Sequence, residues 1–436
     1  MSRTGARVRS METTSYDCVE MFGAPSVRLR ASPPRLTAGM ARRTICHMTP
    51  PIDFLEAARA LVPTLAAREP ATMAARQVPP ETIADFHRTG ILRIVQPRRF
   101  GGYQASFGVF SSIVEILADG CASSAWVYAV LGEHQWIIAC MPEQAQRDVW
   151  DGDPLALASS SLAPRETARA VTGGWRLSGR FPFSSGCLHS QWAIIGARCE
   201  DTSGGGQPTR YLLVPMQEIE IIDDWEVLGL RGTGSMSLLL NDIFVPAHRS
   251  VLLRDLFEGS TPGALVHPDY PLPAVPRGLL APFSLPCVAF TVARRALDLV
   301  ANSLRTRISR GTRVMSESEV VQQQLGEAAA EIETAILVMN ARRDAALALA
   351  DSGAPVPPEL VLRNRRDIAF AVWQLRRGVE RLVELAGART VYDTDQLQSL
   401  WRDLTTICTH TVVSRHLGMV PYGRMLLGLP PASGEA

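Results

Sequence analysis

The spacing at which apolar residues recur changes twice along this chain of 436 residues. From about residue 52 to 150, and again from about 278 to 428, apolar residues return every three or four positions, which is the period of an amphipathic helix. Between about 155 and 255 they alternate with other residues, which is the period of a strand. The pattern therefore predicts helices, then an inserted β-region, then helices again.

Both helical regions contain segments that predict burial. In the first, "FSSIVEILADG" places Ile113, Ile116 and Leu117 at helical spacing, and the following "CASSAWVYAVLG" is almost wholly apolar, so we expect it to be buried on most sides. The second contains a stripe with intervals of four and three residues, which predicts a helix of a four-helix bundle. The stripe is formed by Ile368, Val372, Leu375, Val379, Leu382 and Ala386.

In the central region, "GGWRLSGRFPFSSG" alternates and is followed by short apolar runs such as "QWAIIGARC" and "RYLLVPM", which the turn "EDTSGGGQPT" separates. We expect an antiparallel sheet or barrel there. The predicted fold is mainly α with inserted β: an N-terminal helical domain at 48–152, a central β-barrel at 153–262 and a C-terminal four-helix bundle at 263–436. Residues 1–47 hold eight arginines against three acids and no sustained periodicity, so we expect a disordered tail or an over-extended gene start.

Composition excludes several classes of function. All 44 basic residues are arginine, and without lysine the chain cannot form a Schiff base or a Walker A loop. A net charge of +1 does not favour capture of nucleic acid, and no apolar run reaches the roughly 18 residues that a membrane span needs. The eight cysteines are scattered without a CxxC pair, so we expect neither a metal site nor disulfides, as in a cytoplasmic protein.

Four stretches follow one another in a recognisable order: "GRFPFSSGCLHSQWAIIGA" at 179–197, "WEVLGLRGTGSMSLLLNDIFVP" at 225–246, "ARRALDLVANSLRTRISRG" followed by "VVQQQLGEAAAEIE", and "WRDLTTICTH". In this order and spacing they resemble the acyl-CoA dehydrogenase superfold, and the resemblance covers about residues 52–430. It implies a flavin site near a subunit boundary and a homotetramer.

The terminal segment departs from the dehydrogenase pattern. Dehydrogenases of this fold commonly place a Glu shortly after "RD" to remove a proton beside a thioester carbonyl, but in "RDLTTICTHTVVSRH" no acid follows Asp403. "FSSGCLHSQWAIIGA", "GLRGTGS" and the ending "YGRMLLGL" resemble instead the oxygenase components of two-component flavin monooxygenases, such as 4-hydroxyphenylacetate 3-hydroxylase and the steroid-degrading phenol hydroxylase.

This second resemblance implies the reaction. A separate NAD(P)H:flavin reductase supplies reduced FMN or FAD, O2 is the co-substrate, and a C4a-hydroperoxyflavin hydroxylates an aromatic phenol or a natural-product intermediate. The chain lacks a GxGxxG-bearing βαβ unit, as expected if it has no nicotinamide site of its own. N- or S-oxygenation, an acyl-CoA dehydrogenase-like FAD oxidoreductase, and a flavin-free scaffold are the alternatives.

The resemblance also assigns cofactor-binding residues. Ser185 in "FSSG" matches the position that approaches flavin N5, with Ser184 as its substitute, although the same residues also suit the end of a strand. Ser159 and Ser161 in "LALASSSLAP" match the loop at the flavin edge, and Arg310 in "RISRGTRV" matches the arginine that binds the flavin phosphate.

Two histidines are the catalytic candidates. His410 falls in the region of the dehydrogenase base, where an imidazole can take a proton from a phenol or hydrogen-bond the hydroperoxide. His134 in "LGEHQW" lies where relatives place a substrate-contacting histidine, and beside Glu133 it needs a polar partner if buried. His416, six residues after His410, would point about 120° away on a helix and is expected to be structural.

Overall fold

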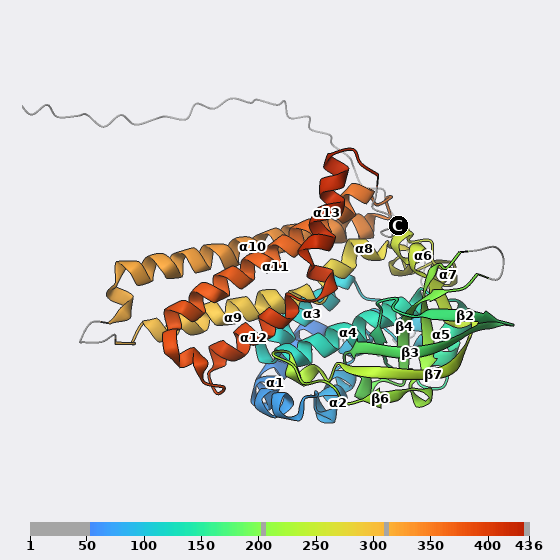
Figure 1. The fold of residues 1–436 in the computed structure, drawn as a ribbon, viewed down its shortest axis with the longest axis horizontal. Coiled ribbons are helices and arrows are strands. Elements are labelled where there is room, and N and C mark those ends of the chain that lie inside the picture. Colours follow the sequence, from blue (N-terminus) through green and yellow to red (C-terminus); the bar gives the residue numbers. More distant parts are fainter. Residues whose placement is uncertain (1–52, 202–205, 309–313, 431–436) are drawn as a thin grey trace, which may run out of the picture. The chain divides into compact units, whose positions relative to one another are not determined.

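The computed structural model describes residues 53–201, 206–308 and 314–430 (Figure 1). The prediction for residues 1–47 lies outside this part. The first region is helical, as the periodicity predicted. It comprises α1 (Phe54–Ala75), α2 (Pro80–Arg88), α3 (Phe107–Gly120), α4 (Ala122–Ala139) and α5 (Glu143–Trp150).

Every residue of α4 is buried, which confirms the prediction made from its apolar sequence. The helix packs on α3 and α9 on one side and on the first strand of the sheet on the other. It therefore lies between the bundle and the sheet (Figure 1). Side chains that α4 directs toward either layer are removed from water.

The central region forms the predicted β-structure. Its strands pair in the order β6-β7-β3-β2-β4-β5-β8, and β1 joins β4. Most pairs are antiparallel, but β1–β4 and β2–β4 are parallel, and the pairing path is open at β6 and β8. Alternation of apolar residues reveals a strand but not the direction of its partner. The strands are β1 (Ala158–Ser161), β2 (Thr167–Val171), β3 (Gly174–Ser184), β4 (Trp192–Cys199), β5 (Thr209–Pro215), β6 (Glu220–Ile222), β7 (Met236–Pro246) and β8 (Ser250–Leu252).

Helices return after the sheet. The short α6 (Leu253–Glu258), α7 (Pro262–Val266) and α8 (Arg277–Leu280) precede α9 (Pro286–Leu304), α10 (Glu319–Ser352), α11 (Pro358–Ala386), α12 (Gln396–Ile407) and α13 (Arg415–Leu426). Helices α9 to α12 form the four-helix bundle, with α11 touching the other three. The boundaries of the three domains stay a prediction.

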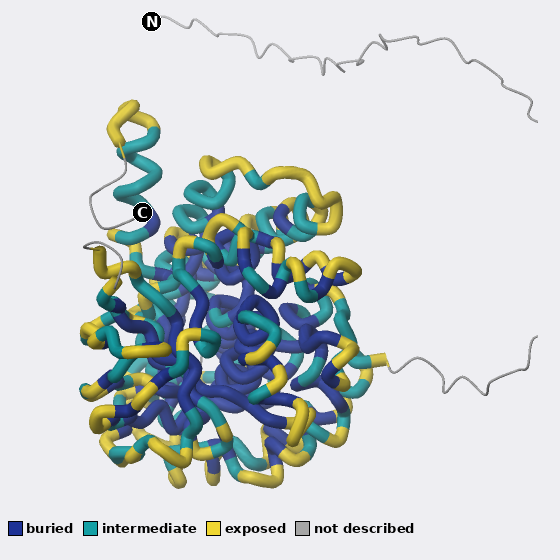
Figure 2. Tube along the Cα trace, turned by 90° about the vertical axis from the view of Figure 1, so that its right-hand side faces the viewer, coloured by how far each residue is buried: buried dark blue, intermediate teal, exposed yellow. Residues whose placement is uncertain are grey.

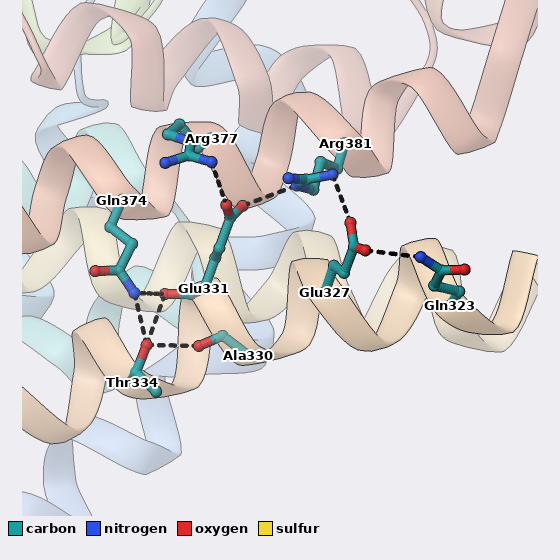
Figure 3. A network of polar contacts seen from close by, with 8 residues as sticks. All are labelled: Gln323, Glu327, Ala330, Glu331, Thr334, Gln374, Arg377 and Arg381. Carbon is teal, nitrogen blue, oxygen red and sulfur yellow. Dashed lines mark hydrogen bonds and ion pairs between the residues drawn. The ribbon is translucent and has the colours of Figure 1, made fainter.

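The predicted apolar stripe of α11 is buried from Ile368 to Leu382. A polar network ties the outer side of α11 to α10 (Figure 3). Glu331 of α10 pairs with Arg377 at 2.9 Å and with Arg381 at 3.1 Å. The bundle thus combines an apolar interior with charged cross-links at its surface.

Buried positions gather in the interior of the described part, and exposed ones lie at its periphery (Figure 2). Among the described residues, no helix is long and apolar enough to cross a membrane. Those residues also hold no cluster of His, Cys, Asp or Glu arranged to bind a metal ion.

Candidate active site

A bulge at the end of β3 directs its last two serines to different places. The register against β7 shifts between Phe181 and Ser184, and Phe183 adopts a left-handed φ of +66° with its side chain 63% exposed. Ser184 is then fully buried and donates a hydrogen bond to Ser159 Oγ at 3.0 Å. Ser185 faces α4 instead, where Trp126 Nε1 donates to its Oγ at 3.2 Å.

Trp126 also contacts the other end of the chain. Its ring meets the imidazole of His410 edge-on, with 5.4 Å between the ring centroids. The structure shows that one indole joins Ser185 after β3 to His410 after α12.

His410 is held in one neutral form. It caps the 3-10 helix η11 (Thr411–Val413), and its Nδ1 accepts a hydrogen bond from Val412 N–H at 3.2 Å. Burial lowers the pKa of His410 to about 4, and the charges of Glu133 and Arg277 act on it in opposite directions. A neutral ring that accepts at Nδ1 carries its hydrogen on Nε2. No described residue accepts that Nε2–H, so it is a donor available to a ligand.

His134 has protein partners on both ring nitrogens. Nδ1 lies 2.6 Å from the Ala158 carbonyl, which can only accept, so Nδ1 carries the hydrogen and Nε2 accepts from Ser160 Oγ at 3.0 Å. Burial lowers its pKa to about 4. Its own nitrogens are therefore satisfied, and Ser160 is the group through which His134 can reach a ligand.

The alternation of strand β1 separates its three serines. Ser159 accepts from Ser184, and Ser161 donates to the Pro182 carbonyl at 2.7 Å, so both hydroxyls bind β3 and its end. Ser160 points to the opposite side, toward His134. Ser159 and Ser161 thus have hydroxyls engaged within the protein, and their cofactor role stays a prediction. Arg310 lies outside the described residues. His416 is exposed on α13.

The carboxylates of Glu133 and Asp403 each bind another part of the protein. Glu133 forms an ion pair with Arg277, the first residue of α8. Asp403 of α12 accepts a hydrogen bond from Leu230 N–H at 2.6 Å, and burial raises its pKa to about 7. Beside Leu230, a Cβ on Gly229 would lie 2.1 Å from the Arg402 carbonyl, so only glycine allows this approach of the loop to α12.

Sequence reasoning missed several members of the site. Thr233 and Ser235, from "GLRGTGS", form a hydroxyl chain with Ser185: the Oγ atoms of Ser185 and Ser235 are 2.6 Å apart, and Ser235 Oγ lies 2.7 Å from Thr233 Oγ1. Ser160 was missed too, although strand alternation alone predicts that it faces away from Ser159 and Ser161. No local pattern predicts the hydroxyl chain, because its members come from different segments.

These residues fit a flavin ring. Ser185 offers a hydroxyl group to a ring edge, and Trp126, whose indole N–H binds Ser185, offers an aromatic wall. The exposed Phe183 lies two residues before Ser185. The same region holds a hydrogen-bond donor, the Nε2–H of His410. A planar, polar-edged aromatic group needs such a combination of apolar walls and few directed polar contacts.

Comparison with known proteins defines the class first. Residues 285–415 match the family model described as "Acyl-CoA dehydrogenase, C-terminal domain", which spans α9 to α12 and His410. The fold described above is thus the acyl-CoA dehydrogenase fold, which confirms the predicted fold class.

Whole-chain relatives define the family. The chain is 32% identical over 375 residues to the oxygenase subunit HsaA of a flavin-dependent monooxygenase from Rhodococcus jostii (85% of this chain, 97% of the relative). It is 35% identical to the oxygenase component of an FADH(2)-dependent resorcinol hydroxylase from a Rhizobium species (83% and 90%). The crystal structure of HsaA from M. tuberculosis superposes with a TM-score of 0.81 at 30% identity, covering 87% of this chain and 98% of that one. This chain belongs to the family of oxygenase components of flavin-dependent monooxygenases.

Proposed function

We propose that this oxygenase hydroxylates a phenolic substrate, using reduced FMN or FAD supplied by a separate reductase. One atom of O2 enters the aromatic ring and the other leaves as water, and the two electrons come from the reduced flavin, which is thereby oxidised. When bound, the reduced flavin supplies the reaction with O2. The protein's part is to bind, orient, exclude water and hold hydrogens.

The observation that carries this proposal is the form of His410. A neutral ring with its hydrogen on Nε2 donates a hydrogen bond into the site and cannot take a proton at the same atom. Of the two roles predicted for His410, this supports the donor rather than the base. Glu133 and Asp403 are engaged elsewhere, so the arrangement does not favour a dehydrogenase, which needs a carboxylate base.

Ser160 and His134 are assigned to the substrate. Because Ser160 donates its hydrogen to His134 Nε2, its oxygen lone pairs are left to accept. A phenol O–H is a suitable donor to that oxygen. In this assignment His134 is a positioning residue that fixes the direction of the Ser160 hydroxyl, and Trp126 and Ser185 face the cofactor.

We also propose a homotetramer in the cytoplasm. The outer face of α10 and α11 supports self-association, since Leu337 is 68%, Phe370 46% and Val338 40% exposed. Val338 and Phe370 line a groove of about 380 Å³ that reaches Met419 of α13. Light scattering of the wild type and of Leu337→Glu tests this proposal. We expect the mass of a tetramer for the wild type and a smaller mass for Leu337→Glu. An unchanged mass in the variant would contradict the assignment of this face to the subunit contact. The cysteines in the described part are free thiols, in keeping with a reducing compartment.

The test of the activity uses labelled oxygen. Photoreduced FMN or FAD is mixed anaerobically with the protein and a panel of phenols beginning with resorcinol, the substrate in the name of one relative, and ¹⁸O2 is then admitted. We expect one ¹⁸O atom per product by mass spectrometry. Reduction of bound FAD by an acyl-CoA, with no labelled phenol product, would instead establish the dehydrogenase alternative.

A further inference from the structure

The segment after the "GLRG" turn supplies a chain of three hydroxyl groups that ends at Ser185. Thr233 Oγ1 donates to the Leu230 carbonyl at 2.9 Å, Thr233 and Ser235 hydroxyls lie 2.7 Å apart, and those of Ser235 and Ser185 lie 2.6 Å apart. All three residues are buried. Gly234, between Thr233 and Ser235, has a φ of +54°, which turns the backbone so that the hydroxyl groups of these two residues meet.

The Leu230 carbonyl accepts from Thr233 Oγ1 at 2.9 Å, the shortest of the three bonds that it accepts from described residues, and this bond gives the direction of the hydroxyl chain. A carbonyl only accepts, so the single hydrogen of Thr233 Oγ1 is directed to Leu230. Thr233 must then accept from Ser235, and the hydrogen of Ser235 is no longer available to Ser185. Ser185 therefore donates its own hydrogen to Ser235.

Because its one hydrogen is used in the bond to Ser235, Ser185 Oγ can only accept a hydrogen bond from any further group. An oxygen with one hydrogen has two lone pairs, and one of them accepts the Trp126 Nε1–H at 3.2 Å. No other described residue donates to the second. Had the chain run in the opposite direction, Ser185 would present a hydrogen at the same place.

We propose that Thr233 and Ser235 are positioning residues that hold the Ser185 hydroxyl in the accepting orientation, aimed at the N5–H of the reduced flavin. This rests on the proposed function. When substrate is not hydroxylated, reduced flavin and O2 yield oxidised flavin and H2O2, and that release requires the N5 hydrogen to leave. An acceptor that holds this hydrogen opposes the release, whereas a hydroxyl hydrogen pointing at N5–H would repel it.

Thr233 offers the sharpest variants, because it touches Ser185 only through Ser235. Thr233→Val keeps the shape but removes the acceptor of Ser235, so Ser235 is free to donate to Ser185 and to turn the Ser185 hydrogen outward. Thr233→Ser keeps the hydroxyl. Ser237→Ala is the matched control, since this buried serine of β7 donates to Asp224 instead of the chain.

The first measurement needs no flavin. The indole Nε1–H resonance of Trp126, identified by its loss in Trp126→Phe, reports on Ser185 Oγ in the apoprotein by ¹⁵N–¹H NMR. We expect this resonance to shift in Thr233→Val and Ser235→Ala but to stay in place in Thr233→Ser and Ser237→Ala. Equal shifts in Ser235→Ala and Ser237→Ala would overturn the proposal, whether or not the protein hydroxylates phenols.

The second measurement is the H2O2 formed per reduced flavin oxidised in the presence of substrate. We expect a rise of about threefold to tenfold in Thr233→Val and Ser235→Ala, with the dissociation constant of reduced flavin changed less than twofold, and recovery in Thr233→Ser; the range corresponds to about one neutral hydrogen bond. In a Ser185→Ala background, Ser235→Ala should add nothing. An additional rise in the double variant would show that Ser235 acts independently of Ser185 and would overturn the proposal. A wild type that forms only H2O2 with every phenol would contradict the proposed function, while the NMR result would stand.

Discussion

Two segments of this protein each carry one carboxylic acid and one imidazole, and the partners of these groups differ between the segments. On α4, Glu133 is paired with Arg277, and His134 has a partner on each ring nitrogen. On α12 and the turn after it, Asp403 accepts one backbone N–H and has no ion-pair partner among the described residues. Within the same residues, only Nδ1 of His410 has a hydrogen-bond partner.

The pKa does not distinguish the two histidines, because burial lowers the pKa of both to about 4. Hydrogen bonding does distinguish them. A ring with both nitrogens satisfied is part of the scaffold, and a ring with a free Nε2–H can act on a ligand. We therefore assign to α4 the role of a structural support for the site and to the α12 segment the role of acting on the ligand.

Asp403 carries the largest expected effect. Asp403→Asn keeps an oxygen to accept Leu230 N–H but cannot ionise. Burial raises the pKa of Asp403 from 3.8 to about 7, so the folded state holds this proton more tightly than the unfolded state, and stability decreases as pH rises from about 4 to 7. Asparagine does not ionise, so its stability lacks this decrease. Between pH 4 and pH 8, we expect the free energy of unfolding of Asp403→Asn to rise relative to that of wild type by up to about 4 kcal/mol.

Denaturant unfolding of both proteins at several pH values measures this. Parallel stability curves for Asp403→Asn and wild type would show that the carboxyl is not strained in the folded state. The α12 segment would then resemble α4, and the comparison would be wrong at this residue.

The burial of α4 and the position of His410 were predictable from the sequence, but the hydrogen-bond partners of the two histidines were not. The almost wholly apolar run before His134 predicted a buried α4, and the position of His410 after "RD" predicted a place at the site. Whether each histidine has a ring nitrogen without a partner depends on distant residues such as Ser160 or on local backbone geometry, as for Val412 N–H. The bulge at Phe183, which separates Ser184 from Ser185, likewise arises from pairing with β7 and has no local sequence pattern.

His134 should control the acid side of the stability profile. Its folded pKa of about 4 is below the ordinary 6.5, so the unfolded state binds the proton more readily, and stability falls as pH decreases from 6.5 toward 4. In wild type this loss amounts to about 3 kcal/mol. His134→Asn retains a donor to the Ala158 carbonyl and should be less stable at pH 7 but flatter in this window. The exposed His416→Asn is the control, and an equal flattening there would refute the assignment.

His410 should affect the reaction directly, in addition to the pH dependence of stability that its lowered pKa shares with that of His134. We expect His410→Ala to lower the hydroxylated product per reduced flavin by roughly 10- to 100-fold while reduced flavin still binds, as for loss of one directed donor. His410→Gln places an amide N–H near the position of Nε2–H and should recover most of the yield. A base cannot be replaced by an amide, so a glutamine variant as inactive as the alanine variant would restore the base role and remove the donor role.

Ser160 gives the smallest effect and decides whether α4 is support alone. Its hydroxyl donates to His134, which leaves its oxygen to accept the phenol O–H. Loss of one neutral hydrogen bond of about 1 kcal/mol predicts that Ser160→Ala raises the KM for the phenol about fivefold, with no change in reduced-flavin binding. Ser237→Ala, a serine of β7 bound to Asp224, should leave that KM unchanged. If Ser160→Ala lowers stability but leaves KM as in wild type, the α4 side contributes no contact to the substrate, and the chemistry belongs to the α12 side alone.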